Sequence, residues 1–284
     1  MELKQIPVVP FVLLGGLMAA LYWDVVSEMA NVWWTDPAYS HGLLIPPLAL
    51  YIAYIQKDYI LAAPVRPSAS GLWLTAFGCV VLVVGKLGAE FFLTRQSLVI
   101  ILAGMVLTYW GWERLWRVAF PLVLLATMVP LPTIVYNKLA APLQLFSSWV
   151  ASETLDAMGV PVFRDGNVMH LPEISLGVAE ACSGLRSLSS LTVLSLVVGF
   201  FVLATAWGKA LLFFLSFPAA IAINVVRVTA TALMAREDPR LAEGFFHSFS
   251  GWIVFLVGFA LLYAVATGIS YLERPGKTPD PEAV

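Results

Sequence analysis

Charged side chains are scarce in this chain. Asp, Glu, Lys and Arg make up 12% of its 284 residues, against about 25% in a typical soluble domain. Hydrophobic residues make up 60%, more than one water-exposed fold can bury. The net charge is −2 and no basic cluster stands out, so nothing attracts nucleic acid over a distance. The composition predicts a protein that is embedded in a lipid bilayer and does not bind nucleic acid.

Cysteine and histidine are also rare. The chain has two cysteines and three histidines, and these do not fall at the spacing of metal ligands. We therefore expect no metal and no other cofactor. Cys79 lies midway along an apolar run and Cys182 at the edge of another, so they should sit at different depths, which argues against a disulfide. For Cys79 we favour a packing role, which is common for free cysteine.

Long apolar runs supply the expected membrane spans, since a helix needs about 20 mostly apolar residues to cross a bilayer. About eight segments qualify, at residues 8–26, 42–56, 71–88, 97–111, 118–135, 185–206, 209–234 and 251–271. The sequence thus predicts an all-α, polytopic transmembrane helical bundle, with residues 1–272 forming a single membrane-embedded domain. Residues 273–284 are polar and proline-rich and should form a disordered cytoplasmic tail.

The distribution of Lys and Arg among the connections favours a cytoplasmic N-terminus. Two long connections, residues 24–41 and 130–184, then fall on the outer side. Between residues 139 and 158, apolar residues at helical spacing predict a helix that lies at the membrane interface. Residues 160–171, with a turn at Asp165 and Gly166, predict a short hairpin. The second connection is therefore expected to be a small periplasmic insertion.

Reactive side chains gather in residues 179–188, just before an apolar run. A helix that begins at Ser183 or Gly184 would place Cys182 at its N-terminus, where the helix dipole and free N–H groups favour a thiolate. Arg186, four residues further on, would add positive potential on the same face. The plainer alternative is a small residue in a turn, with Arg186 extending to the lipid head groups.

Arg227 lies well inside the seventh apolar segment. Arginine at such depth costs at least a few kcal/mol against lipid, so it should face the protein interior. Asn224 shares its helical face and is placed to orient the guanidinium. A structural ion pair with Glu180 is one alternative. Another is a transporter or channel in which Arg227 binds an anionic solute, although the internal repeats common in transporter folds are missing.

Any of the three histidines could exchange a proton with a thiol near neutral pH. His247 precedes the last apolar segment, His41 also stands at the outer end of a span, and His170 lies in the expected hairpin. Spacing alone does not choose between them. In the predicted topology, however, Cys182, Arg227 and His247 share one depth on the outer side. Together they would supply a nucleophile, a cation for the oxyanion and a base.

Five strings, in the expected order, resemble those of the exosortase/archaeosortase family. Members of that family are multi-spanning enzymes that process proteins with a C-terminal sorting signal of the PEP-CTERM type. The strings are residues 36–42 (DPAYSHG), 164–168 (RDGNV), 180–186 (EACSGLR) and 224–229 (NVVRVT), and His247 with the following Gly251 and Trp252. The resemblance implies a cysteine protease or transpeptidase of the bacterial inner membrane, with an active site that faces the periplasm.

The resemblance also implies a role for each candidate residue. Cys182 would attack a peptide carbonyl, Arg227 would stabilise the oxyanion, and His247 would protonate the leaving amine. An acceptor amine or water would then release the acyl-enzyme. The supporting or substrate-binding residues would be Arg186, Glu180, Asn224 and His41.

The expected partners are exported proteins whose signal comprises a short motif, a transmembrane helix and a basic tail. A third interpretation, a structural membrane subunit for polysaccharide export, would leave the Cys182 thiol inert.

Overall fold

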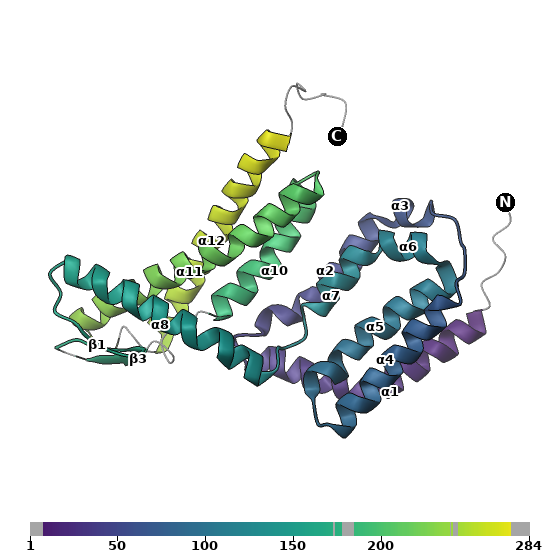
Figure 1. The fold of residues 1–284 in the computed structure, drawn as a ribbon, viewed down its shortest axis with the longest axis horizontal. Coiled ribbons are helices and arrows are strands. Elements are labelled where there is room, and N and C mark those ends of the chain that lie inside the picture. Colours follow the sequence, from purple (N-terminus) through teal and green to yellow (C-terminus); the bar gives the residue numbers. More distant parts are fainter. Residues whose placement is uncertain (1–7, 173, 178–184, 239, 241–243, 274–284) are drawn as a thin grey trace. The chain divides into compact units, whose positions relative to one another are not determined.

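The computed structural model describes residues 8–172, 174–177, 185–238, 240 and 244–273. The chain divides into two compact units, residues 1–132 and 133–284. Both units consist mainly of helices (Figure 1).

The first unit is a set of helices with short connections. Its elements are α1 (Val8–Thr35), the 3₁₀ helix η1 (Ser40–Leu43), α2 (Ile45–Ile55), α3 (Lys57–Leu61), α4 (Ser70–Leu87), α5 (Phe91–Trp110), α6 (Trp112–Arg117) and α7 (Ala119–Ala126). Helix α4 packs along α5 because Gly71, Gly78 and Gly85 lie against the α5 backbone and side chains. Small residues allow this close approach where no hydrophobic effect drives helices together.

The second unit places a small sheet beside a helical bundle. Its elements are α8 (Thr133–Ala157), β1 (Phe163–Asp165), β2 (Val168–His170), β3 (Ser175–Gly177), α10 (Leu185–Val202), α11 (Ala206–Glu237) and α12 (Gly244–Glu273). Helices α10, α11 and α12 pack side by side, and α8 packs on α11 (Figure 1). At one end of the bundle, the Glu273 carboxylate accepts hydrogen bonds from the backbone N–H groups of Ala204 and Thr205. This contact ties the end of α12 to the start of α11.

The three strands form an antiparallel sheet in the order β1-β2-β3. Gly166 has φ 60° and is the first of two central residues in the β1–β2 turn, the position where a type II′ hairpin requires glycine. One sheet face is buried, since Met169 and Leu176 belong to the same core cluster as residues of α8 and α11. The predicted hairpin is thus confirmed, and β3 is a strand that the sequence did not predict.

Within the described part of the chain, five helices are long and apolar enough to cross a membrane: Val12–Thr35, Ser70–Leu87, Phe91–Trp110, Ala206–Glu237 and Gly251–Glu273. Together with the dominance of helix, they confirm an all-α transmembrane protein. Among the remaining predicted spans, two appear as the shorter apolar helices Ile45–Ile55 and Ser187–Val202. In the segment at 118–135, helix α7 has only 8 residues. The count of eight spans therefore stays a prediction.

Two further expectations concern the segments outside the spans. The helix expected at 139–158 is present as part of α8, while its position at a membrane interface stays a prediction, as does the single-domain description of residues 1–272. Of the expected tail at 273–284, Glu273 ends α12, and residues 274–284 lie outside the described part of the chain.

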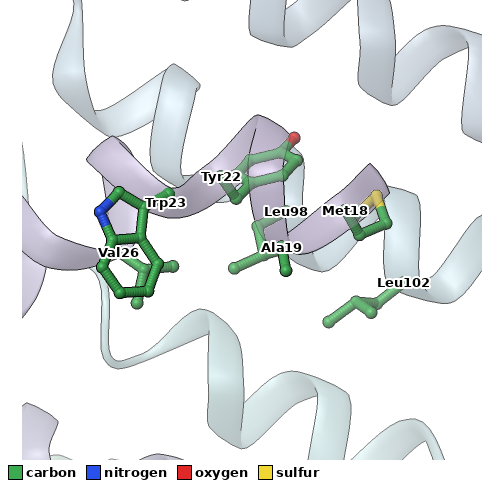
Figure 2. A pocket seen from close by; sticks show the side chains of 7 residues that line it. All are labelled: Met18, Ala19, Tyr22, Trp23, Val26, Leu98 and Leu102. Carbon is green, nitrogen blue, oxygen red and sulfur yellow. The ribbon is translucent and has the colours of Figure 1, made fainter. Parts of the chain in front are cut away.

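The first unit carries an open hollow of about 290 Å³ between α1 and α5. Figure 2 shows its lining residues, which are apolar apart from the Tyr22 hydroxyl and the Trp23 indole N–H. The Tyr22 hydroxyl is hydrogen-bonded to Ser97 Oγ at 2.6 Å. The lining offers no carboxylate, thiol or imidazole, so this hollow is not a candidate for the catalytic chemistry.

Candidate active site

Arg227 is buried inside the second unit. Its residue is 5% exposed, and Asn224, one helical turn earlier, is 2% exposed. The guanidinium lies directly against the α12 backbone at Gly251, where an added Cβ would be 3.2 Å from Arg227 Nη2 and 3.4 Å from Cζ. The prediction that Arg227 faces the protein interior is therefore confirmed. A side chain at this position would crowd the guanidinium.

Asn224 joins α11 to α8. Its Nδ2 donates a hydrogen bond to Ser147 Oγ at 3.0 Å, and both residues are buried. Interhelical polar contacts of this kind hold membrane helices in register. The sequence did not single out Ser147, because its partner lies 77 residues away. The bond fixes the helical turn that precedes Arg227, while the expected contact of Asn224 with the guanidinium stays a prediction.

Three residues mark a common level in the bundle of α10, α11 and α12. An added Cβ at Gly258 of α12 would be 2.9 Å from Leu191 Cδ2 and 3.0 Å from Ile223 Cδ1. These residues of three helices therefore lie side by side. The level serves as a reference for the residues closer to the helix ends.

From that level, the start of α10, Arg227 and Gly251 all lie toward the same end of the bundle. Helix α11 runs antiparallel to α10 and α12. This end of the bundle therefore contains the N-terminal turns of α10 and α12 and the part of α11 that follows Ile223. At 1.5 Å per residue, Leu185 lies about 9 Å, Arg227 about 6 Å and Gly251 about 10 Å from the reference level. The bundle thus brings the first turn of α10, the Arg227 guanidinium and the first turns of α12 together.

Two of the candidate residues lie near the beginning of a helix. Arg186 is the second residue of α10, and His247 is the fourth residue of α12. His247 comes four residues before Gly251, so the two positions share one helical face. This is the face on which Gly251 meets Arg227. Cys182 and Glu180 lie outside the described residues, and the chain reaches them three and five residues before α10 begins.

His41 belongs to the first unit, in a compact turn formed by residues 36–42. Asp36 Oδ1 accepts a hydrogen bond from the Ala38 N–H at 2.8 Å, and the chain then enters η1. A side chain at Gly42 would collide with the Trp33 indole, whose Nε1 donates to Met128 O at 2.9 Å. The DPAYSHG string therefore has a local structural reason for its glycine.

Burial lowers the pKa of His41 below its usual 6.5, because the protonated imidazole loses hydration. The unfolded chain therefore takes up this proton at a higher pH than the folded chain. It follows that the folded state loses stability as the pH falls below about 6.5.

We expect His41→Gln to reduce the loss of thermal stability between pH 7.5 and pH 5.5. The measurement is the melting temperature of wild type and variant in the same detergent at both pH values. His170→Gln is the matched control, because His170 lies on the sheet surface, where its Nδ1 is hydrogen-bonded to Ser175 Oγ at 2.7 Å. An identical loss in wild type and His41→Gln would show that His41 does not carry this pH dependence.

Among the described residues, no group of three or more His, Cys, Asp or Glu side chains could hold a metal ion. What the described site offers is a buried cation beside one helix, with the beginnings of two helices at its level. Such an arrangement can stabilise an anion that forms during a reaction.

A comparison with protein families identifies the chain more closely. The model of the family described as "Transmembrane exosortase (Exosortase_EpsH)" matches residues 33–264. This range contains all seven candidate site residues, His41, Glu180, Cys182, Arg186, Asn224, Arg227 and His247. Neither the curated proteins nor the solved structures gave a significant match. Because the family match covers well over half of the sequence, the chain belongs to the transmembrane exosortase family.

Proposed function

We infer that this chain is a membrane-embedded cysteine protease or transpeptidase that cleaves the C-terminal sorting signal of exported proteins through an acyl-enzyme on Cys182. Family membership implies a role in protein sorting by this kind of chemistry. The observation that carries the specific proposal is the buried Arg227 guanidinium, which lies against α12 one turn from the His247 position.

The reaction proceeds in two steps. In the first, the Cys182 thiolate attacks the scissile carbonyl carbon and forms an S–C bond, and the carbonyl oxygen becomes an oxyanion. Collapse of this intermediate breaks the C–N bond, and His247 gives a proton to the leaving amine. In the second step, an acceptor amine or water gives a proton to His247, attacks the thioester carbon and releases the thiolate. Transfer to an amine is transpeptidation, and transfer to water is hydrolysis.

Arg227 is assigned to the oxyanion. A preorganised donor in a site from which water is excluded stabilises developing charge more than water does, and it needs no reorganisation during the reaction. The guanidinium lies against the α12 backbone at Gly251 on one side, and its own helix is fixed to α8 by the Asn224–Ser147 bond. Both contacts restrict the freedom of the guanidinium before the substrate arrives.

The substrates we propose are exported proteins with a PEP-CTERM-type signal, which comprises a motif, a transmembrane helix and a basic tail. The transmembrane helix would hold the substrate in the bacterial inner membrane, with its scissile bond at the depth of the periplasmic head groups. Cys182, Arg227 and His247 would meet it there. Arg186, Glu180 and His41 are proposed to support this site or to bind the substrate.

The reactivity of Cys182 tests this proposal against the two alternatives. We expect a membrane-impermeant maleimide, added from the periplasmic side, to label Cys182. The labelling rate should rise with pH at a midpoint below about 8.5, the pKa of an ordinary thiol. A peptide that carries a PEP-CTERM-type signal should slow the labelling. Cys79→Ser removes the second thiol, so that only Cys182 reports. An inert thiol would favour the structural subunit, and a reactive thiol that the peptide leaves unprotected would also contradict the proposal.

Gly251→Val should lower kcat/KM for cleavage of the PEP-CTERM-type peptide by about 10- to 100-fold, because displacing a catalytic group by about 1 Å reduces the rate by roughly that factor. The added side chain would crowd the Arg227 guanidinium and displace it, because even its Cβ would be only 3.2 Å from Nη2. Gly268→Val is the matched control, since a Cβ at Gly268 meets nothing within 4 Å on the same helix. Equal kcat/KM for Gly251→Val and Gly268→Val would mean that the position of Arg227 does not matter for the reaction.

A further inference from the structure

The outward edge of β3 carries main-chain groups that no other described strand pairs with. Leu171 N–H donates to Ile174 O at 2.9 Å, which closes the β2–β3 turn with a hydrogen-bonded pair. Pairs alternate in an antiparallel ladder, so the next hydrogen-bonded pair in the observed register is Met169 with Leu176. The N–H and C=O groups of Ser175 therefore point away from β2.

The same alternation applies to Gly177, which pairs with Val168 at the other end of β3. Its N–H and C=O groups also point to the outward edge. In the chain as described, β3 is an edge strand with no further strand beside it. The opposite edge strand, β1, packs on α8 instead, and the hairpin turn is fixed there by the hydrogen bond from Ser148 Oγ to Gly166 O at 3.1 Å. An edge with unpaired main-chain groups is a template for another extended chain.

The β3 edge is tied to the helix that carries Arg227. Leu176, at the centre of β3, belongs to one core cluster with Val228, Ala232 and Ala235 of α11. Val228 directly follows Arg227. Chain connectivity adds a second link, because Gly177 comes five residues before Cys182, which limits their Cα separation to about 18 Å. A peptide on this edge would therefore lie within a few residues of the proposed reaction centre.

We propose that the outward edge of β3 binds the extended segment of the exported substrate that precedes its scissile bond, and that this segment adds to the sheet as a fourth strand. The proposal rests on the proposed function and names the surface that aligns its substrate. A chain must be unfolded locally to be cleaved. An extended peptide offers N–H and C=O groups that can pair with those of an edge strand. Ser175 and Gly177 are about 7 Å apart along the strand, the spacing of alternate residues in a peptide.

The sheet also provides a row of side chains for recognition. Phe163, His170 and Ser175 lie opposite one another on the three strands. The Phe163 and His170 rings are stacked, with their centroids 5.9 Å apart. His170 Nδ1 is hydrogen-bonded to Ser175 Oγ at 2.7 Å. A substrate residue paired with Ser175 would extend this row by one position and would contact it as a cross-strand neighbour.

A backbone scan of the substrate tests the pairing without changing the protein. Single N-methyl groups are placed at successive residues before the scissile bond of the PEP-CTERM-type peptide, and kcat/KM is measured with the full chain in lipid nanodiscs. We expect a fall of about 10-fold or more at every second residue and little change between them, because successive N–H groups of a strand point in opposite directions. Uniform sensitivity or uniform tolerance would overturn the proposal.

Ser175→Pro tests the β3 edge itself. Proline removes the outward N–H and is tolerated at an edge where that N–H makes no ladder bond. We expect kcat/KM to fall by about 10-fold or more, while the maleimide labelling rate of Cys182 without substrate stays at the wild-type value. A wild-type kcat/KM would overturn the proposal. If labelling shows that the variant is misfolded, the backbone scan and the following cross-linking decide.

Cross-linking locates the bound peptide. The protein carries Cys79→Ser and Cys182→Ala, so that an introduced cysteine is its only thiol. Ser175→Cys should form disulfides with cysteines at alternate positions of the peptide, whereas Phe163→Cys, two strands away, should not. Preferential cross-linking to Phe163→Cys, or none to Ser175→Cys, would place the peptide elsewhere. These outcomes leave the proposed function intact if cleavage depends on Cys182, and loss of that dependence would refute the function independently of the β3 edge.

Discussion

Replacing Arg227 with lysine should lower kcat/KM for cleavage of the sorting signal by about 100- to 1,000-fold, the usual cost of losing one oxyanion-hole donor. Lysine keeps the positive charge but not the planar guanidinium, and its ammonium group is compact and strongly hydrated. The guanidinium fits beside the α12 backbone at Gly251, and an ammonium would not keep the same donor direction. Arg227→Met should be at least as inactive. The measurement is steady-state cleavage of the PEP-CTERM-type peptide.

Arg236→Lys is the matched control for this substitution. Arg236 lies in the last turn of the same helix and is exposed, so its change should leave kcat/KM within about twofold of wild type, as surface substitutions usually do. Both variants should be recovered from the membrane in equal amounts. Near wild-type cleavage by Arg227→Lys would show that a point charge is sufficient, and near wild-type cleavage by Arg227→Met would remove Arg227 from the mechanism.

Cys182→Ala should reduce cleavage to the uncatalysed background, a loss of at least about 10⁴-fold by analogy with removal of other covalent nucleophiles. Without the sulfur there is no acyl-enzyme, and the guanidinium and imidazole cannot replace the S–C bond. Co-expression of the variant with a tagged exported substrate should show uncut precursor in membranes on a protein gel. Cys79→Ala is the control. The expected buried packing position of Cys79 is wrong, since the structure has this free thiol exposed on α4 of the first unit, and the variant should process the substrate normally. Processing by Cys182→Ala would refute the nucleophile assignment.

The sequence predicted the burial of Arg227 because the cost of a charge in lipid leaves few alternatives, and it placed Asn224 on the same helical face. Both residues are indeed buried. The hairpin was also predictable, since Gly166 sits at the turn position where a positive φ is needed. In these cases one strong local constraint is enough to determine the structure.

Other features depend on contacts between distant residues, and spacing along the chain does not reveal them. The span predicted at 97–111 leaves Arg95 in the preceding connection, but the structure buries Arg95 inside α5. The helix begins before the apolar run because the Glu90 side chain accepts a hydrogen bond from Leu93 N–H at 2.7 Å, and glutamate is a weak signal for a helix start. The Asn224–Ser147 bond likewise joins two helices that are far apart in sequence.

Strand β3 was missed for a related reason. Its residues, Ser175, Leu176 and Gly177, have little intrinsic preference for a strand. The segment is extended because it pairs with β2 and because Leu176 is buried in the core that the sheet shares with α8 and α11. The edge that we propose as a peptide-binding surface therefore becomes visible only in the folded unit.

The central claim is that a covalent intermediate forms on one sulfur. We propose to incubate the full chain in nanodiscs with the PEP-CTERM-type peptide, to quench with acid, and to identify the modified residue by mass spectrometry of protease fragments. The account predicts a hydroxylamine-sensitive thioester on Cys182 whose mass equals that of the peptide segment before the scissile bond, and no such adduct in Arg227→Met. Cleaved product without any adduct on Cys182, or an adduct on another residue, would contradict it.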